Sequence, residues 1–287
     1  MDIDKKIYKL TSAKNRVWGI YAQDMETGKK FTLNSDRIFE SASTIKLQIL
    51  LALFKKIGDE KISLHTPLKI ASKQIGKGSG ILQYFDLSKP ITLYNIALLM
   101  IIVSDNSATN VLIDYLGKDY INKCIKSIGL ANTRLLTEKV DFPANFKRAK
   151  TKMANTTAFD MAKTFIDLEN FKLFDEKMTK KIIKILCEQE YNGKIPRLLP
   201  TWANLGVKRQ KIIKIGNKTG TIVYERDNFL TYSSDVALIY PKRRRTIVMA
   251  IYMEGQGEKN HIFTSDNAAN TTMSKIGLLL YNYFTQK

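Results

Sequence analysis

A serine and a lysine separated by two residues are the pair in this sequence with the clearest chemical use. Ser43 and Lys46 would lie on one face of a helix, with the lysine amine within reach of the serine hydroxyl. Isoleucine and leucine dominate residues 45–54, and burial among them disfavours the charged amine and lowers its pKa. A neutral amine accepts a proton, so Ser43 is a candidate nucleophile and Lys46 its candidate base.

A Ser-Asp-Asn triplet at residues 104–106 contains two more groups that such a reaction needs. The Ser104 hydroxyl can relay a proton to a leaving nitrogen, which is the acid step of an acyl transfer. The Asn106 side chain has both donors and an acceptor, so it can hold a substrate amide. An ordinary turn also suits this triplet, and its significance therefore depends on the other motifs.

A Lys-Thr-Gly triplet, Lys218 to Gly220, supplies a positive charge. Lys218 can fix Ser104 and attract a substrate carboxylate, and Thr219 can donate a hydrogen bond to the same carboxylate. Gly220 permits another backbone segment to approach closely. The N–H of Thr221 and that of the nucleophile can then stabilise an oxyanion. By itself this triplet is also typical of the end of a strand.

Hydrophobic patterning indicates the elements that must position these motifs. Residues 44–57 and 92–103 are rich in apolar side chains, which predicts two buried helices, and another helix is predicted at 107–116. The Ser-Asp-Asn triplet therefore falls in a break between helices. A serine begins the first helix, where serine is a favoured cap and the helix dipole stabilises an anion. β-branched residues and glycines at 212–222 predict a strand around the Lys-Thr-Gly triplet.

The two ends of the chain show further strand and helix patterns, whereas the middle is nearly all helical. Strands are predicted at Val17–Gln23 and Lys29–Asn34, as a hairpin around Thr27-Gly28, and at 234–240 and 246–253; helices are predicted at 2–16 and 267–284.

In this order, the three motifs resemble those of class A β-lactamases and closely related penicillin-recognising serine hydrolases. Other stretches are similar to that family as well: GSGIL at 78–82, MIIVSDNSATNVLIDYLG at 100–117, TTAFDMA at 156–162, YNGKIPRLLP at 191–200 and DVALIYP at 235–241. The resemblance covers about residues 17–285. It implies a serine hydrolase that opens the β-lactam amide bond through an acyl-enzyme on Ser43.

The resemblance also implies the fold class, which is α/β (α+β) with a β-lactamase-like architecture. A five-stranded antiparallel sheet flanked by helices is expected, together with an inserted all-helical domain. The implied domains are a discontinuous α/β domain of residues 1–46 and 204–287 and a helical domain of residues 47–203. Ser43 would lie at the seam between them, where pockets often form.

The segment that should supply the base for hydrolysis of the acyl-enzyme departs from the family. The family has a Glu there, followed four residues later by an Asn, and no residue of 133–145 reproduces that pair. With a two-residue insertion, Asp141 takes the Glu position and Asn145 the Asn position. Without the insertion, Glu138 falls near the site but lacks its Asn partner. We favour Asp141, with Glu138 as the alternative.

An aspartate in this role has a consequence for rate. Its side chain is one methylene shorter, which holds the carboxylate back by about 1.5 Å. A misplacement of about 1 Å can cost about a hundredfold in rate. We therefore expect efficient acylation and slow deacylation. For the acylation step itself, both Lys46 and Asp141, acting through water, stay open as the base.

An arginine close to the Lys-Thr-Gly triplet is a second candidate cation for the substrate. Arg226 can anchor a carboxylate, as an Arg on this part of the sheet does in relatives, although an ion pair with Asp227 is the alternative. The expected substrate is a small-molecule β-lactam or an acyl-D-Ala-type compound.

Composition and charge exclude several other classes of partner. Lys and Arg number 46 against 27 Asp and Glu, a net charge of +19, but the basic residues are scattered and no nucleic-acid motif is present. No nucleic-acid partner is therefore expected. His65 and His261 have no partner at metal-ligand spacing, so no metal is predicted, and no cofactor is expected.

Location is less constrained by the sequence. No run of about 18 apolar residues is present, which predicts no stable membrane insertion. The charged residues 2–16 lack the apolar centre of a signal peptide, whereas the resemblance implies an enzyme that acts outside the cytoplasm as a monomer.

Three functions are compatible with these residues. The first is a serine β-lactamase. The second is a penicillin-binding D-alanyl peptidase or esterase of the same fold, which the missing Glu favours. The third is a non-enzymatic binding module, which the intact set of two serines and two lysines disfavours.

Overall fold

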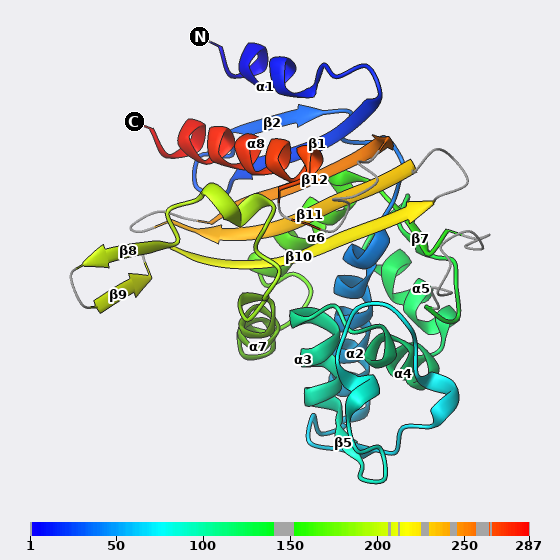
Figure 1. Ribbon diagram of the computed structural model, residues 1–287. Coiled ribbons are helices and arrows are strands. Elements are labelled where there is room, and N and C mark those ends of the chain that lie inside the picture. The colour runs from blue at the N-terminus through cyan, green and yellow to red at the C-terminus, as the bar shows by residue number, and fades with distance from the viewer. Residues whose placement is uncertain are drawn as a thin grey trace.

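A five-stranded antiparallel sheet with helices on both faces occupies one part of the molecule, and a group of helices lies beneath it (Figure 1). The computed structural model describes residues 2–140, 152–205, 208–211, 213–224, 230–241, 246–256, 264 and 266–286. Helices α1 (Ile3–Thr11) and α8 (Ala268–Thr285), from opposite ends of the chain, pack together on one face of the sheet. The predicted fold class is confirmed.

The strand order β10-β11-β12-β1-β2 joins the two ends of the chain in one sheet. β1 (Arg16–Asp24) pairs with β2 (Lys30–Leu33) on one side and with β12 (Ile247–Gln256) on the other. β11 (Leu230–Tyr240) joins β12 to the edge strand β10 (Lys214–Tyr224). These strands confirm the predicted hairpin and the three later strands within a few residues.

Both faces of the sheet are buried, and alternate side chains belong to different cores. In β11, Val236 and Leu238 pack into the core shared with the helices beneath the sheet, whereas Ala237 and Ile239 pack against α1 and α8. Side chains along a strand point alternately to its two faces, so two buried faces require a nearly continuous apolar run. The sequence DVALIYP has this pattern.

The remaining helices and short strands have the following bounds and pairings. The helices are α2 (Lys46–Glu60), α3 (Leu93–Ile102), α4 (Asn106–Leu116), α5 (Lys118–Ser127), α6 (Ala158–Glu169) and α7 (Glu176–Cys187), with single 3₁₀ turns η1 (Ala42–Ile45), η2 (Ser72–Gln74), η3 (Leu82–Tyr84) and η5 (Ile195–Leu198). The short strands form three pairings: β3 (Phe39–Glu40) with β7 (Ala154–Thr156) and β6 (Arg134–Leu135), β4 (Pro67–Leu68) with β5 (Ile91–Thr92), and β8 (Trp202–Leu205) with β9 (Lys208–Lys211).

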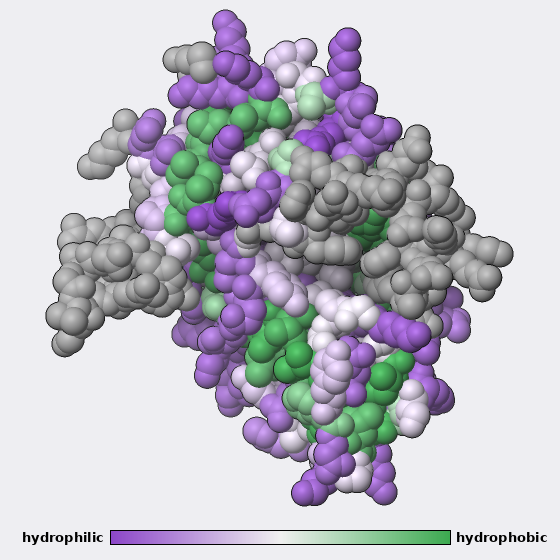
Figure 2. Space-filling model, viewed as in Figure 1, coloured by the Kyte–Doolittle hydropathy of each residue, from purple (hydrophilic) through white to green (hydrophobic). Residues whose placement is uncertain are grey.

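The helices divide between the sheet and the group beneath it. α6 lies against β1, β11 and β12 and covers the second face of the sheet, while α2 contacts α3, α4, α5 and α7. The division into an α/β domain and a helical domain of residues 47–203 stays a proposal. None of the described helices is both long enough and apolar enough for a membrane span. Hydrophilic side chains cover much of the face shown in Figure 2, in keeping with the net charge of +19.

Candidate active site

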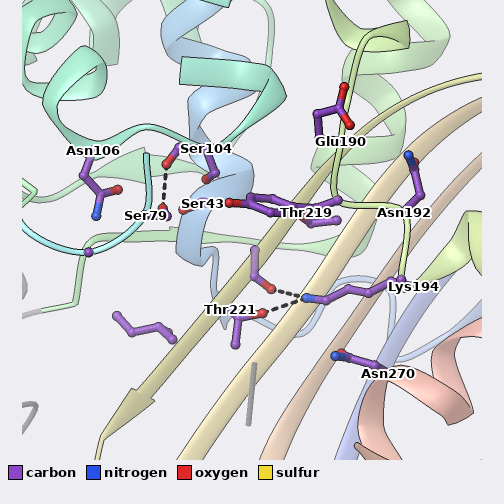
Figure 3. A pocket seen from close by; sticks show the side chains of 15 residues that line it. Ser43, Ser79, Ser104, Asn106, Glu190, Asn192, Lys194, Thr219, Thr221 and Asn270 are labelled. Carbon is purple, nitrogen blue, oxygen red and sulfur yellow. Dashed lines mark hydrogen bonds between the residues drawn. The ribbon is translucent and has the colours of Figure 1, made fainter. Parts of the chain in front are cut away.

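A cavity of about 630 Å³ lies between the start of α2, the edge strand β10 and the loop that precedes η5. Six of its lining residues were predicted from the sequence: Ser43, Ser104, Asn106, Thr219, Gly220 and Thr221. The other lining residues are Gly78, Ser79, Glu190, Tyr191, Asn192, Gly193, Lys194, Ile222 and Asn270. Figure 3 shows Ser43, Ser104 and Thr219 grouped on one side of the cavity, with Lys194, Thr221 and Asn270 on the other.

Ser43 lies in the 3₁₀ turn η1, directly before α2, and not within the α-helix itself. Ala42 has a φ of +47°, a left-handed conformation that costs a residue with a Cβ about 1–2 kcal/mol. The turn is held by Thr44, whose hydroxyl donates to the Ser41 carbonyl at 2.7 Å and lies 2.8 Å from the Tyr252 hydroxyl. A strained, well-anchored turn thus presents a half-buried Ser43 to the cavity.

Lys46, the first residue of α2, is fully buried, and its amine connects α2 to the Ser-Asp-Asn segment. Its Nζ donates to the Ser104 carbonyl at 2.6 Å and to Asn106 Oδ1 at 2.8 Å, and lies 3.1 Å from Ser104 Oγ. Burial, together with the charge of Lys218, lowers the pKa of this amine well below its usual value, against the opposing charge of Asp105. The pKa of Lys46 is therefore lowered, which is the direction that the sequence predicts.

The helical backbone is interrupted at the Ser-Asp-Asn segment, between α3 and α4, as predicted. Ser104 has a φ of +52°, and its carbonyl accepts hydrogen bonds from Lys46 and from Ser79 Oγ at 2.7 Å. Asp105 caps α4 through the Ala108 N–H at 2.9 Å and also accepts from the backbone of Ile81. These bonds fix Ser104 in an otherwise unfavourable backbone conformation.

The Asn106 side chain links Lys46 to the backbone at the cavity wall. Its Oδ1 accepts from Lys46, and its Nδ2 donates to the Lys77 carbonyl at 2.9 Å. The amide is thereby oriented, since only this assignment satisfies both partners. The side chain lines the cavity and is available to a substrate at its edge.

The edge strand β10 approaches the Ser43 turn closely at Gly220. A Cβ at this position would lie 2.9 Å from the Ser41 carbonyl oxygen and 3.0 Å from the Ser43 nitrogen. Only a residue without a side chain allows this approach. The close contact brings the backbone of Gly220 and Thr221 beside the Ser43 N–H, where the predicted oxyanion site would lie.

Lys218 is also fully buried, but its hydrogen bond differs from the one predicted. Its Nζ donates to the Thr219 carbonyl at 2.9 Å, and no hydrogen bond to Ser104 occurs among the described residues. Burial lowers the pKa of Lys218 to about 7; the Asp235 carboxylate opposes this shift and the charge of Lys194 adds to it. Lys218 therefore contributes to the site through its charge beside Lys46.

Lys194 lines the cavity and was not predicted from the sequence. Its buried Nζ donates to Thr221 Oγ1 at 2.9 Å (Figure 3). It also donates to the Gly220 carbonyl at 2.6 Å and to the Ser234 carbonyl at 3.1 Å. Burial lowers its pKa to about 7, against the charge of Asp235. The stretch YNGKIPRLLP contains this lysine, but nothing in its spacing connects residue 194 with residue 221.

The candidate residues for deacylation are placed only in part. Asp141, Asn145 and Arg226 lie outside the described residues. The carboxylate of Glu138 pairs with Lys118 at 3.1 Å, its side chain is 78% exposed, and it is absent from the described lining of the cavity.

The residue just before the undescribed segment 141–151 is firmly held. Asn110 accepts from the Val140 N–H at 2.7 Å and donates to the Val140 carbonyl at 3.0 Å. α4, which begins at the Ser-Asp-Asn segment, therefore also holds Val140, the last described residue before Asp141 in the sequence.

Charged groups of both signs surround the cavity. Lys194 and Glu190 are part of its lining, the buried Lys46 and Lys218 lie close to it, and Asp105 and Asp235 are buried near these lysines. The described residues contain no group of His, Cys, Asp and Glu side chains suited to a metal ion.

Comparison with known proteins gives a consistent result over nearly the whole chain. The sequence model of the beta-lactamase enzyme family matches residues 2–284. β-Lactamase SME-1 of Serratia marcescens is 23% identical over 259 residues, covering 86% of this chain and 79% of that protein. A β-lactamase of Bacteroides uniformis is 23% identical over 288 residues, covering 98% of this chain and 90% of that protein.

Solved structures with the same fold are numerous. A β-lactamase from Sphaerobacter thermophilus has a TM-score of 0.81 at 22% identity, covering 99% of this chain and 98% of its own. PBP-A has a TM-score of 0.80 at 23% identity, covering 99% of this chain and 96% of its own. An ancestral class A β-lactamase has a TM-score of 0.81 at 20% identity, covering 98% of this chain and all of its own. At these identities the structural matches establish the fold.

Proposed function

The chain belongs to the beta-lactamase enzyme family, and from this premise we propose that it hydrolyses the β-lactam amide bond through an acyl-enzyme on Ser43. The observation that carries the proposal is the buried Lys46 amine, three residues after Ser43 in the chain and 3.1 Å from the hydroxyl of Ser104. The proposed nucleophile and base, both at the start of α2, and the proposed acid in the Ser-Asp-Asn segment are thus brought together beside one cavity.

In the acylation step, Ser43 Oγ attacks the ring carbonyl and gives up its proton. Lys46 is the proposed base, because burial favours its neutral form and a neutral amine has a lone pair for the proton. Asp141, acting through a water molecule, is the alternative base. The new bond joins Ser43 Oγ to the carbonyl carbon, which becomes tetrahedral and negatively charged at oxygen.

Backbone N–H groups would stabilise that oxyanion. The N–H of Ser43 is one donor and that of Thr221 the other, and removing one such donor typically costs about 10²–10³ in rate. The approach of Gly220 to the Ser43 nitrogen supports this pairing, because it brings β10 against the turn that holds the nucleophile.

Collapse of the tetrahedral intermediate breaks the bond to the ring nitrogen, which then needs a proton. Ser104 is the proposed donor. Once Lys46 carries the proton from Ser43, it can pass one to Ser104 Oγ as the Ser104 hydroxyl protonates the nitrogen. The proton from the nucleophile thereby replaces the one that Ser104 gives up.

The carboxylate of the substrate would bind on the opposite side of the cavity. Lys194 donates to Thr221 Oγ1, which leaves the Thr221 hydroxyl hydrogen free to point at an anion. Thr219 lines the same cavity, and the buried Lys218 adds charge behind it. Arg226 stays a further candidate for this role.

Hydrolysis of the acyl-enzyme requires an activated water. We propose Asp141 as its base, with Asn145 as partner, because their spacing preserves that of the family and the neighbouring Val140 is held by Asn110. Glu138 is the weaker alternative, since its carboxylate pairs with Lys118 away from the cavity lining. The shorter aspartate leads us to expect slow deacylation.

Intact-mass spectrometry with excess benzylpenicillin tests this function, if adduct and released penicilloate are followed together. A β-lactamase releases penicilloate, and Ser43→Ala abolishes both product and adduct while retaining the wild-type circular dichroism. Absence of both adduct and product in the wild type would overturn the proposal.

A D-alanyl peptidase or esterase of the same fold is the second candidate. The missing Glu-Asn pair in residues 133–145 favours it, because such enzymes form long-lived penicillin adducts. A stoichiometric adduct without product release, together with cleavage of an acyl-D-Ala peptide or ester, would identify this second function.

A further inference from the structure

Asp235 is a fully buried carboxylate that no part of the proposed reaction uses. It lies in β11 directly opposite Thr219 of β10, so it sits beneath the wall of the cavity. Burying a carboxylate is costly unless it is hydrogen-bonded and its charge is balanced. Its partners therefore indicate what the side chain does.

Asp235 accepts two hydrogen bonds from residues adjacent in sequence to a site lysine. Its Oδ2 accepts from the N–H of Ile195, which follows Lys194, at 3.1 Å. Its Oδ1 accepts from Nδ2 of Asn217, which precedes Lys218, at 3.1 Å. One carboxylate thus ties the loop before η5 to the edge strand and fixes the backbone on either side of the anion-binding wall.

The charge of Asp235 also acts on both lysines. It is the carboxylate that opposes the lowering of the pKa of Lys194 and of Lys218 by burial. Burial raises the pKa of Asp235 itself to about 6, against the Asn217 hydrogen bond and the two lysine charges. Its charge is therefore present at neutral pH.

We propose that Asp235 is a positioning residue for anionic substrates: it aligns Lys194 and Lys218 and increases the positive charge that both carry, so that the site prefers β-lactams that have a free carboxylate. This inference rests on the proposed function and adds a residue that acts on its anion-binding wall from behind. Asp235 does not touch the substrate, because Thr219, Gly220 and Thr221 lie between it and the cavity.

Other charged or titratable groups near Asp235 are few among the described residues. Lys194 approaches from the loop before η5, Lys218 from β10 and Tyr252 from β12, and Lys46 with Asp105 lies beyond Lys218. Burial raises the pKa of Tyr252 far above neutrality, so this phenol stays uncharged over the relevant range.

Asp235→Asn removes the charge with little change in packing. Within the described part of the chain, Asn217 Oδ1 has no hydrogen-bond partner, so a flip of the Asn217 side chain lets this oxygen accept from the introduced amide. The oxygen of the introduced amide can meanwhile accept from the Ile195 N–H. The hydrogen bonds to Asn217 and Ile195 are both kept, so Asp235→Asn tests the effect of the negative charge alone. Asp235→Ser, which is also neutral, serves as a second variant should the first be insoluble.

The measurement is the ratio of kcat/KM for benzylpenicillin to that for its methyl ester, which differ only in the carboxylate. At pH 7.5 the ratio should fall about tenfold in Asp235→Asn, the equivalent of one pKa unit on the lysines. Below about pH 6 the wild-type Asp235 is itself protonated and the two proteins should converge.

Asp24→Asn is the matched control. Asp24 is a buried carboxylate of the same sheet that accepts from the Glu26 N–H and the Thr27 hydroxyl, both at 2.9 Å, far from the cavity. In Asp24→Asn, the ratio of kcat/KM for benzylpenicillin to that for its methyl ester should equal the wild-type ratio at every pH. Equal losses on both substrates in Asp235→Asn, or a ratio independent of pH, would overturn the inference while the proposed function stands. A wild type without turnover or adduct would overturn both.

Discussion

The amine of Lys46 lies 2.6 Å from the carbonyl oxygen of Ser104 and 3.1 Å from its hydroxyl. This relationship joins the start of α2 to the break between α3 and α4, so the base for the nucleophile and the acid for the leaving nitrogen form one hydrogen-bonded unit. Disturbing either residue should therefore affect both halves of the acylation step.

Lys46→Met should slow acylation by about 10²–10⁴, the usual contribution of a general base. Methionine has a similar volume and keeps the core filled, but it leaves the Ser104 carbonyl and Asn106 Oδ1 without the lysine donor, which costs about 1–3 kcal/mol of stability. Stopped-flow measurement of adduct formation checks the rate. An unchanged rate constant in a folded variant would instead assign the base to Asp141 through water.

Asp141→Asn should slow release of product and leave adduct formation nearly unchanged, because only deacylation is proposed to depend strongly on this carboxylate. Glu138→Gln is the matched control: it removes a carboxylate that is 78% exposed and paired with Lys118. Time-resolved intact mass separates the two steps. Adduct accumulation in the Glu138 variant and not in the Asp141 variant would reverse the assignment.

Gly220→Ala should reduce acylation about tenfold to a hundredfold, since an added Cβ would push β10 away from the Ser43 turn by a few tenths of an ångström. That Cβ would meet the Ser41 carbonyl at 2.9 Å and the Ser43 nitrogen at 3.0 Å. Gly58→Ala, within α2, is the control, because its Cβ meets Met178 only at 3.4 Å. It should keep full activity and gain about 0.5–1 kcal/mol of stability. Equal activity in both variants would contradict the close-approach argument.

Glu40 should make the free energy of unfolding depend on pH. It is fully buried, and its Oε1 accepts from the N–H groups of Met153 and Ala154. Burial raises its pKa from 4.5 to about 7, so the folded protein binds this proton more tightly than the unfolded chain. Stability is therefore lost as pH rises from about 4.5 to 7, and the loss stays constant above that.

Glu40→Gln removes this dependence and tests its size. A pKa difference of about two and a half units corresponds to about 3 kcal/mol. Urea unfolding at about pH 5 and pH 8 should show a smaller decrease in the variant than in the wild type. The same decrease in both proteins would show that Glu40 is already ionised in the folded state throughout this range.

Local sequence patterns were sufficient where a residue's role depends on neighbours in the chain. The apolar run at 92–103 predicted α3, and the polar triplet after it predicted the break, because a buried helix needs a continuous hydrophobic surface. The packing of alternate β11 side chains into two different cores likewise follows from burial on both faces of the sheet. The prediction for Lys218 was less successful, since its hydrogen bond is made to Thr219 and not to Ser104.

The sequence by itself determined the identity and order of the reactive groups and the elements around them, since side-chain chemistry and helical or strand periodicity are local properties. Only the tertiary structure decided which groups share an environment. Lys194 donates to Thr221, and Asp235 lies behind both Lys194 and Lys218, because loop and strand pairings bring together residues distant in the chain. The pKa values of these groups follow from burial and from charges that no spacing in the sequence reveals.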